Sequence, residues 1–546
     1  DVGGVTGGID RAIASATAAN VLNHLTIPQG GLFKPTSAPG ATYLIETNPA
    51  FTSSRKFLSS DYYLQQMGVH PDQTAKRLGD GFHEQQLVRN QIASLTGKAV
   101  LGPYTDIESM YGALLASGAA LAKALDLPLG VGLSAEQVAR LTGNVILMET
   151  RVVGGQAVLV PVVYLAKAEQ QNLSNGPLIA ATDIDLTNAQ SFVNSGTVSA
   201  SRNLSIDGQQ IDNRYGTLQS GERMTLVTQG NVDLTSANVK AGSLQLQAGG
   251  DLILNTATQT QRQINDTGAT RTTTTLGPQA QIDVTGDAAI ATGGDFEQDA
   301  GHLSVGGALG MNIGGNWTLG TQEIGEQKGV ARANGVSDTD IRGVVGSSVT
   351  VGGASAIAVG GDLTARGAQI DLGGGGAIVA GGSVSLLAAS TTSTVNSSSA
   401  GSGSGRSYAE TYHTSDEQLT GTTLTGGQSV AIVAGKDLTV IGSAISLDKG
   451  NATLAAAGDV NIGAATETHE LNAHETHSHS GVASGTKVAS GIAQTMTLSQ
   501  GSLVSADGVA IVSGKDLTVA GSALVGTNDV TLNAARDVKI TTSQDT

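Results

Sequence analysis

Residues 430–440 read VAIVAGKDLTV, and residues 509–519 repeat this phrase as VAIVSGKDLTV, 79 residues later and with one substitution. A looser copy, AIAVGGDLTA, begins at Ala356. Weaker echoes follow about 21 residues after a copy, as in GGSVSLLAA from Gly381 and AAGDVNIGA from Ala456. A repeat of this length, with a small turn and alternating apolar residues, is typical of a solenoid whose coils stack on one another.

The composition suits stacked coils better than a large globular core. Of the 546 residues, 75 are glycine and only 3% are aromatic, and coils can bury Val, Ile, Leu and Ala against neighbouring coils instead of rings. The formal net charge is −17, and Lys and Arg are not clustered. Because phosphate contacts need clustered cations, we expect no nucleic-acid partner. We also expect the chain to be a monomer.

Three further features of the sequence restrict the class of protein to which the chain can belong. The chain contains no cysteine, which excludes disulfides and thiol chemistry. No stretch of about 18 uninterrupted apolar residues occurs, so the sequence predicts no transmembrane helix. The chain opens with Asp1 and without a signal peptide, from which we expect a piece of a longer protein.

Proline divides the chain into two kinds of sequence, because nine of the ten prolines lie at or before Pro177. We interpret residues 1–40 as a connector and residues 41–168 as a small α+β domain with about three helices and a hairpin. Residues 177–345 are expected to form the first part of a β-helix. Residues 346–546 are expected to continue it as 79-residue repeats with insertions rich in Thr, Ser and His.

Local patterns place the elements of the α+β domain. Apolar residues recur at helical spacing over residues 72–95, with Asp72 as the cap, and again over residues 106–125. Ser134 and Gln137 form a capping box that predicts a third helix. The two strands of the hairpin are expected at residues 145–153 and 157–165.

Alternating triplets recur every 20 residues in the second region: IDL after Asp183, LSI after Asn203, MTL after Arg223 and LQL after Ser243. Successive side chains of a strand face opposite sides, so each triplet suits one short strand. The sequence therefore predicts a mainly β protein, a right-handed parallel β-helix preceded by the α+β domain. Asp and Asn stacked at one corner are expected to bond to backbone N–H groups. A calcium ladder is disfavoured because the nine-residue period of such repeats is missing.

Four insertions interrupt the coils and are rich in Thr, Ser, Gly and charge. We expect them to leave the stack on one side, as hairpins or flexible loops. They occupy residues 257–276, 320–345, 390–424 and 465–497.

The last insertion contains a group of residues that zinc accepts as ligands. They are His469, His474, His477 and His479, with Glu470 and Glu475. The segment has Ser and Gly on its flanks and no apolar support to hold a ligand geometry, so we expect no metal there. We likewise predict no catalytic residue and no cofactor, because no nucleophile elbow, zinc-protease motif or P-loop occurs.

Two groups in the α+β domain have simpler interpretations. The carboxylates of Asp61, Asp80 and Glu84 could be arranged as an acid/base pair, but side chains of this kind on helices are usually solvated. The aromatic residues are expected to anchor the domain core. They are Tyr43, Phe57, Tyr62, Tyr63 and Phe82.

Three long segments without an internal repeat resemble a known protein family. They are ATYLIETNPAFTSSRKFLSSDYYLQQMG at 41–68, RLGDGFHEQQLVRNQIASLTG at 77–97 and VLVPVVYLA at 158–166. They resemble the central region of large secreted proteins of the filamentous haemagglutinin type. The likeness is strongest to CdiA-type effectors of contact-dependent growth inhibition in Gram-negative bacteria. Residues 346–546 resemble the second haemagglutinin-repeat region of the same proteins.

The resemblance implies export by two-partner secretion through an outer-membrane transporter, and a place on the bacterial cell surface. It implies a non-catalytic filament and toxin-delivery segment whose partner is the outer membrane or a surface receptor of a target cell. The alternative is the stalk of an adhesin that binds host or neighbouring cells. A third class, a polysaccharide-cleaving enzyme on a β-helix, is disfavoured because the few aromatic residues of the coils are scattered along the sequence.

Overall fold

The structure is a computed structural model that describes residues 17–28, 33–36, 40–47, 57–70, 76–96, 100–166 and 178–546. The chain forms two compact units. The first comprises residues 1–243, 253–255 and 277–283, and the second comprises residues 244–252, 256–276 and 284–546. Within the described part, no helix combines the length and apolar character needed to cross a membrane.

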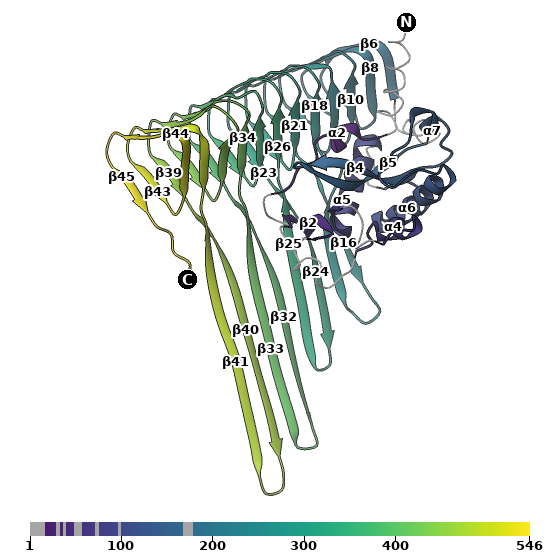
Figure 1. Ribbon diagram of the computed structural model, residues 1–546, viewed down its shortest axis with the longest axis vertical. Helices are drawn as coiled ribbons and strands as arrows, with labels where there is room; N and C mark the ends of the chain where they lie inside the picture. Colours follow the sequence, from purple (N-terminus) through teal and green to yellow (C-terminus); the bar gives the residue numbers. More distant parts are fainter. Residues whose placement is uncertain are drawn as a thin grey trace. The chain divides into compact units, whose positions relative to one another are not determined.

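The first unit begins with a mixed five-stranded sheet in the order β1-β2-β3-β5-β4 (Figure 1). Strands β4 and β5 form a hairpin that is buried on both faces. The strands are β1 (Phe33–Pro35), β2 (Tyr43–Thr47), β3 (Arg77–Gly79), β4 (Val145–Val153) and β5 (Gln156–Tyr164). The helices are α2 (Ala19–Leu22), α4 (Asp61–Gln66), α5 (Gly81–Thr96), α6 (Ile107–Ala124) and α7 (Ala135–Ala139).

Aliphatic side chains on alternate positions of the hairpin build two cores. One core joins Ile146 and Met148 to Val88 of α5 and to Met110 and Leu115 of α6. The other core uses the remaining positions of the hairpin and includes residues of α2, β2, β3 and α7: Leu22, Leu44, Leu78, Val138, Leu147, Val160 and Val162. The hairpin is therefore the central layer of this region.

Most of the local signals in this region are confirmed. Asp106 caps α6, because its Oδ1 accepts a hydrogen bond from the Ser109 backbone N–H at 2.8 Å. The capping box of Ser134 and Gln137 begins α7, and the hairpin strands lie within a residue of their predicted bounds.

The first predicted helix starts in the wrong place. β3 occupies part of its range, and Asp80 rather than Asp72 accepts the hydrogen bond from the His83 N–H at the start of α5. Gly81 follows Asp80, and a Cβ atom there would lie 2.7 Å from the carbonyl oxygen of Phe57, so glycine allows the close approach at the start of the helix. Asp72 itself lies outside the described residues. The stretch expected as a connector also contributes structure, since Leu22 is buried and β1 pairs with β2.

The coils of the first unit begin at residue 178, and their strands pair in parallel. Ile184 is in register with Leu204, and Leu204 with Met224, so the predicted triplets stack on one another. The strands are β6 (Leu178–Ala189), β7 (Phe192–Val193), β8 (Thr197–Gly208), β9 (Ile211–Asp212), β10 (Thr217–Ser220), β11 (Arg223–Thr228), β12 (Val232–Asp233) and β13 (Asn238–Ala241). Two more short strands are β15 (Leu252–Ile253) and β18 (Gln281–Val284).

The second unit continues the pattern with three strands per coil, each paired in parallel with its equivalents. One series is β14 (Ser243–Ala248), β19 (Ala288–Thr292), β22 (Leu309–Ile313), β27 (Ser355–Val359), β30 (Gly376–Ala380), β35 (Val430–Ala434), β38 (Asn451–Ala456), β42 (Leu503–Ser513) and β44 (Ala523–Ala534).

The second series is β21 (His302–Val305), β26 (Ser348–Val351), β29 (Gln369–Leu372), β34 (Thr423–Gly426) and β37 (Ala444–Leu447), which pairs with β42. The third series is β20 (Phe296–Asp299), β23 (Trp317–Gly320), β28 (Leu363–Arg366), β31 (Val384–Leu387), β36 (Leu438–Ile441), β39 (Val460–Gly463), β43 (Leu517–Ala520) and β45 (Val538–Thr541). Three parallel faces and an aliphatic interior make this a β-helix, as the repeat predicted.

A ladder of polar side chains runs along one corner of the second unit. Asp437 Oδ1 accepts a hydrogen bond from the Asp459 backbone N–H at 2.8 Å, and Asp459 Oδ1 accepts one from the Asp516 N–H at 2.9 Å. The complete series is Asp251, Asp295, Asn316, Asp362, Ser383, Asp437, Asp459, Asp516 and Asp537. The structural role predicted for stacked Asp and Asn is therefore confirmed.

The ladder gives a testable prediction at Asp459. Asp459→Ala removes the acceptor for the Asp516 N–H and should cost about 1 kcal/mol, because a typical hydrogen bond contributes about that much net. Hydrogen exchange of the Asp516 amide should become about fivefold faster. Asp459→Asn keeps an Oδ1 acceptor and should exchange at nearly the original rate. Equal acceleration in both variants would show that charge, not the hydrogen bond, matters.

All four insertions are hairpins that leave the coils of the second unit on one side, so this prediction is confirmed (Figure 1). Their strands are β16 (Thr258–Ile264) with β17 (Thr270–Leu276), β24 (Gln322–Arg332) with β25 (Gly335–Val345), β32 (Ala389–Gly403) with β33 (Arg406–Thr420), and β40 (Ala465–Ser480) with β41 (Gly485–Gln500).

The hairpins also pair with each other, which the sequence did not predict. β17 pairs with β24, β25 with β32, and β33 with β40, giving one eight-stranded antiparallel sheet, which we call the hairpin sheet. Two coils lie between the β24–β25 hairpin and the β32–β33 hairpin. Two coils also lie between the β32–β33 hairpin and the β40–β41 hairpin. Two coils rise by about 9.6 Å, the width of two strands, so successive hairpins meet edge to edge.

Candidate functional site

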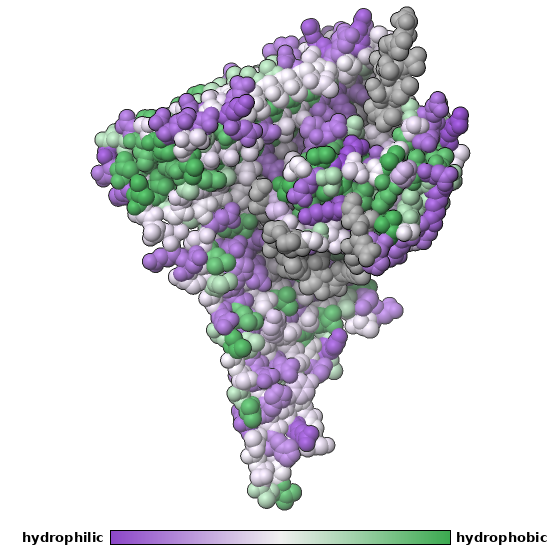
Figure 2. All heavy atoms as spheres, in the orientation of Figure 1, coloured by the Kyte–Doolittle hydropathy of each residue, from purple (hydrophilic) through white to green (hydrophobic). Residues whose placement is uncertain are grey.

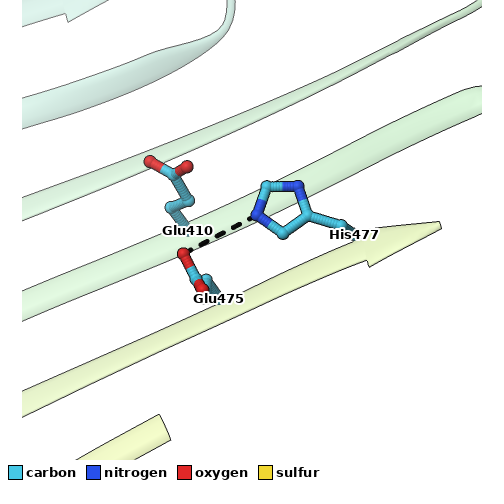
Figure 3. Close-up of side chains that lie close together, drawn as sticks. All are labelled: Glu410, Glu475 and His477. Carbon is cyan, nitrogen blue, oxygen red and sulfur yellow. Dashed lines mark ion pairs between the residues drawn. The ribbon is translucent and has the colours of Figure 1, made fainter. Parts of the chain in front are cut away.

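The β32–β33 and β40–β41 hairpins bring together three side chains that can bind a metal. Glu410 of β33 is in register with Glu475 of β40, and His477 lies two residues further along β40 on the same face. One ligand atom of each residue lies within 4.8 Å of those of the other two. Figure 3 shows the three side chains close together, with a dashed line marking the ion pair between Glu475 and His477.

Strand alternation divides the histidine-rich group that the sequence singled out. Glu475, His477, His479 and His469 fall on one face of β40, whereas Glu470 and His474 fall on the other. The sequence showed no apolar support for this segment, and the structure holds it instead by backbone pairing, because β40 is paired along both of its edges. Glu410 was missed by sequence reasoning because it belongs to the previous insertion, and only the strand register brings it close.

The two glutamates of this group differ in their hydrogen-bond and ion-pair partners. Hydrogen bonds from Ser490 and His477 hold the pKa of Glu475 below its ordinary value. Ser490 Oγ donates to Glu475 Oε1 at 2.8 Å, and His477 Nε2 lies 3.6 Å from Glu475 Oε2. Within the described chain, Glu410 makes no ion pair with a cationic side chain. Two carboxylates therefore face each other with one imidazole beside them.

His469 is held differently from the other histidines of β40. Its Nδ1 lies 2.8 Å from Asp416 Oδ1, and its Nε2 lies 3.2 Å from Glu467 Oε1. Partial burial lowers the pKa of His469, but the hydrogen bonds and charges of these two carboxylates outweigh it and raise the pKa above its ordinary value. Both nitrogens are thus engaged, so His469 acts as a cross-strand link.

A hollow of about 620 Å³ lies beside His477, towards the hairpin ends. Arg406, Tyr408, His477, His479 and Val488 line it, together with neighbouring Gly, Ser and Thr residues. In Figure 2 the hairpin sheet is mostly hydrophilic or neutral in character, with isolated apolar spots. The surface is therefore suited to polar contacts.

The carboxylates of the α+β region do not form an acid/base pair. Glu84 is buried and not solvated, contrary to expectation: its Oε1 accepts from the Ser60 N–H at 3.0 Å and its Oε2 from Tyr111 Oη at 2.9 Å. Asp61 pairs with the buried Arg77. Asp80 accepts hydrogen bonds from the N–H groups at the start of α5 and of Thr47. Each carboxylate has a structural partner.

The aromatic group is only partly in the core. Tyr63 is fully buried, and the rings of Phe57 and Phe82 meet edge to face at 4.8 Å between centroids. The guanidinium of Arg77 lies over the ring of Tyr43, with its Cζ atom 4.6 Å from the ring centroid. Tyr62 is exposed, contrary to expectation.

Glu84 predicts a pH dependence of stability. Burial raises the pKa of Glu84 to about 7, although hydrogen bonds from Ser60 and the charge of Arg77 act against this. The unfolded carboxyl ionises near its ordinary pKa, so between that pH and 7 the folded state binds more protons. The free energy of unfolding should therefore fall as pH rises through this window, by about 3 kcal/mol in total.

The measurement compares urea unfolding of the original chain and Glu84→Gln at several pH values from 4 to 8. The glutamine keeps the shape and cannot ionise, so the difference in unfolding free energy between the two proteins should change across the window and level off above it. A difference that stays constant with pH would contradict a raised pKa for Glu84.

Comparisons with known proteins support the repeat assignment. A haemagglutinin repeat model, Fil_haemagg_2, matches residues 324–409 and 401–546, and the related Fil_haemagg model matches residues 178–236 and 225–271. The tRNA nuclease CdiA-2 of Burkholderia pseudomallei (strain 1026b) is 64% identical over 544 residues, which is 100% of this chain and 17% of that protein. This chain is a close homologue of CdiA toxins and carries their haemagglutinin repeats.

More distant CdiA proteins match as well. The toxin CdiA of Yersinia pestis is 42% identical over 348 residues, covering 63% of this chain and 10% of that protein. The 16S rRNA endonuclease CdiA of Enterobacter cloacae is 30% identical over 513 residues, covering 93% of this chain and 15% of that protein. The chain thus spans less than a fifth of the length of these CdiA relatives. No solved structure matches it. The CdiA likeness implies a secreted surface protein.

Proposed function

We propose that this chain is a non-catalytic filament and delivery segment of a contact-dependent growth inhibition toxin. One observation carries the proposal: the CdiA relatives are named for three different activities, tRNA nuclease, 16S rRNA endonuclease and deoxyribonuclease, yet all match this chain at 30% identity or more. A segment common to all of them does not determine which nucleic acid is cut. Its role is one that every such toxin needs.

The architecture supports a role in display and contact. The second unit is built from coils that repeat one design, and its hairpins add a broad sheet on one side of these coils. In the α+β region, Asp80 accepts a hydrogen bond at the start of α5 and Asp61 pairs with Arg77, so these carboxylates have structural roles. The parent protein would reach the cell surface through a two-partner-secretion transporter, and the segment would meet the outer membrane or a receptor of a target cell.

The test uses the full-length parent toxin with residues 346–546 deleted. Secretion should continue, because the transporter reads a different region of the parent, whereas killing of target cells should be lost. Undiminished killing by a secreted deletion variant would overturn the proposal.

A finer variant keeps the coils and removes only one hairpin. Ala465 and Gln500 are register partners at the base of the β40–β41 hairpin, so a two-residue turn can replace residues 466–499. If the hairpin sheet makes the contact with the target, this variant should lose killing as the larger deletion does. Shortening of the first hairpin, β16–β17, is the matched control.

The second candidate is an adhesin stalk, favoured by exposed apolar side chains on the outermost hairpin strand: Val488, Ile492 and Met496. Such a stalk would hold cells together without delivering a toxin. The purified chain would then bind cells in the absence of any toxin domain, and deletion of residues 346–546 would abolish this cell attachment.

A further inference from the structure

We propose that Glu410, Glu475 and His477 bind a divalent transition-metal ion, which joins two neighbouring hairpins. The set offers two carboxylate oxygens and one imidazole nitrogen within 4.8 Å of one another. Zinc accepts both kinds of ligand in a tetrahedral arrangement, and a site with three protein ligands leaves a position for water. The inference does not depend on the proposed delivery function.

The backbone positions of the ligands are fixed by strand pairing. Eleven consecutive residues of β33, from Arg406 to Asp416, are in register with β40. β40 is paired with β41 along its other edge. Glu410 and Glu475 are therefore held on directly opposed positions of a sheet, where side chains are close neighbours.

The electrostatics of this arrangement favour a cation. Like charges directly opposite each other on neighbouring strands are destabilising. Glu475 has Ser490 and His477 as partners, whereas Glu410 has no ion pair in the described part of the chain. A divalent cation would neutralise both carboxylates, and it binds the neutral form of His477.

The surroundings can orient the ligands. Ser490 Oγ donates to Glu475 Oε1, so the other carboxylate oxygen is the one directed to His477. Hydrogen bonds of this kind fix ligand orientation and support metal affinity. All three side chains are exposed, so water reaches the remaining coordination position.

The experiment is isothermal titration of the untagged 546-residue chain with Zn²⁺ alone at neutral pH. One ion per chain is expected. Glu410→Gln and His477→Ala should each weaken binding by about tenfold or more. His474→Ala is the matched control, because His474 lies on the same strand but on the opposite face. The zinc affinity of this variant should stay within about twofold of that of the original chain.

Two readouts separate a built site from adventitious binding by histidines. With Co²⁺ in place of Zn²⁺, the original chain should show the absorption bands of a coordinated ion, and Glu410→Gln should lose them. Zinc should also slow hydrogen exchange in β33 and β40, because the ion links these two strands. No stoichiometric binding, or equal losses in His474→Ala and His477→Ala, would overturn the proposal.

Discussion

Trp317→Ala should lower the free energy of unfolding of the second unit by about 3–5 kcal/mol, the usual cost of truncating a buried large aromatic side chain. Trp317 is fully buried inside the coils and is in register with Phe296 of the adjacent coil. Their rings stack at 5.9 Å between centroids with 14° between planes. Trp317 Nε1 also donates to Gln298 Oε1 at 3.4 Å. The substitution leaves a cavity and an acceptor without its donor.

The matched control is Trp317→Phe, which keeps most of the ring stack and should lose less than half as much. The chain has a single tryptophan, so its fluorescence cannot serve as the probe. Urea unfolding followed by circular dichroism, with hydrogen exchange of β20 and β23, gives the comparison. A loss below about 1 kcal/mol in Trp317→Ala would show that the coils can close over the cavity, against the tight stacking described here.

Gly118→Ala should destabilise the α+β region by about 3 kcal/mol, because overpacking against backbone cannot be relieved by a side-chain rotation. A Cβ atom on Gly118 would lie 1.8 Å from the carbonyl oxygen of Ile146. Helix α6 and strand β4 therefore approach each other at this glycine. Any side chain there forces the helix away from the central hairpin.

Gly112→Ala on the same helix is the control. A Cβ there would meet only the Cδ2 atom of Leu58, at 2.9 Å, and a flexible side-chain end can move aside. Alanine is favoured over glycine within a helix by about 1 kcal/mol, so this variant should be neutral or slightly stabilised. Urea unfolding of both variants gives the test. Similar stabilities would contradict a close approach at Gly118.

Features set by neighbouring residues could be predicted from the sequence. The triplets after Asp183 and Asn203 stack as expected, the helix predicted over residues 106–125 forms as α6, and Ser134 caps α7 as predicted. The 79-residue period was visible, but its physical meaning was not. It combines two coils with one hairpin. That the rise of two coils equals the width of a two-stranded hairpin becomes apparent only once the strand spacing is known.

Features set by distant residues could not be predicted. Glu84 looked like a solvated helix residue because its partners, Ser60 and Tyr111, are 24 and 27 residues away. Phe296 and Trp317 looked scattered but lie in adjacent coils. Glu410 meets Glu475 only because successive hairpins pair, and a single sequence taken by itself contains no signal of that register.

The central claim is that successive coils lie on one another in the register described. Thr318, Thr364, Ser385 and Thr439 form one column of the second unit, each in register with the next. Adjacent strands are about 4.8 Å apart, within the Cα separation that a disulfide spans, whereas positions two coils apart are not. The chain has no cysteine of its own, so engineered pairs can be read without interference.

The decisive measurement is disulfide formation under mild oxidation, followed by mass spectrometry. Thr364→Cys with Ser385→Cys, and Ser385→Cys with Thr439→Cys, should close rapidly within one molecule. Thr364→Cys with Thr439→Cys should remain reduced, because a whole coil lies between them. Closure of that third pair as fast as the first two would contradict the stacked-coil architecture.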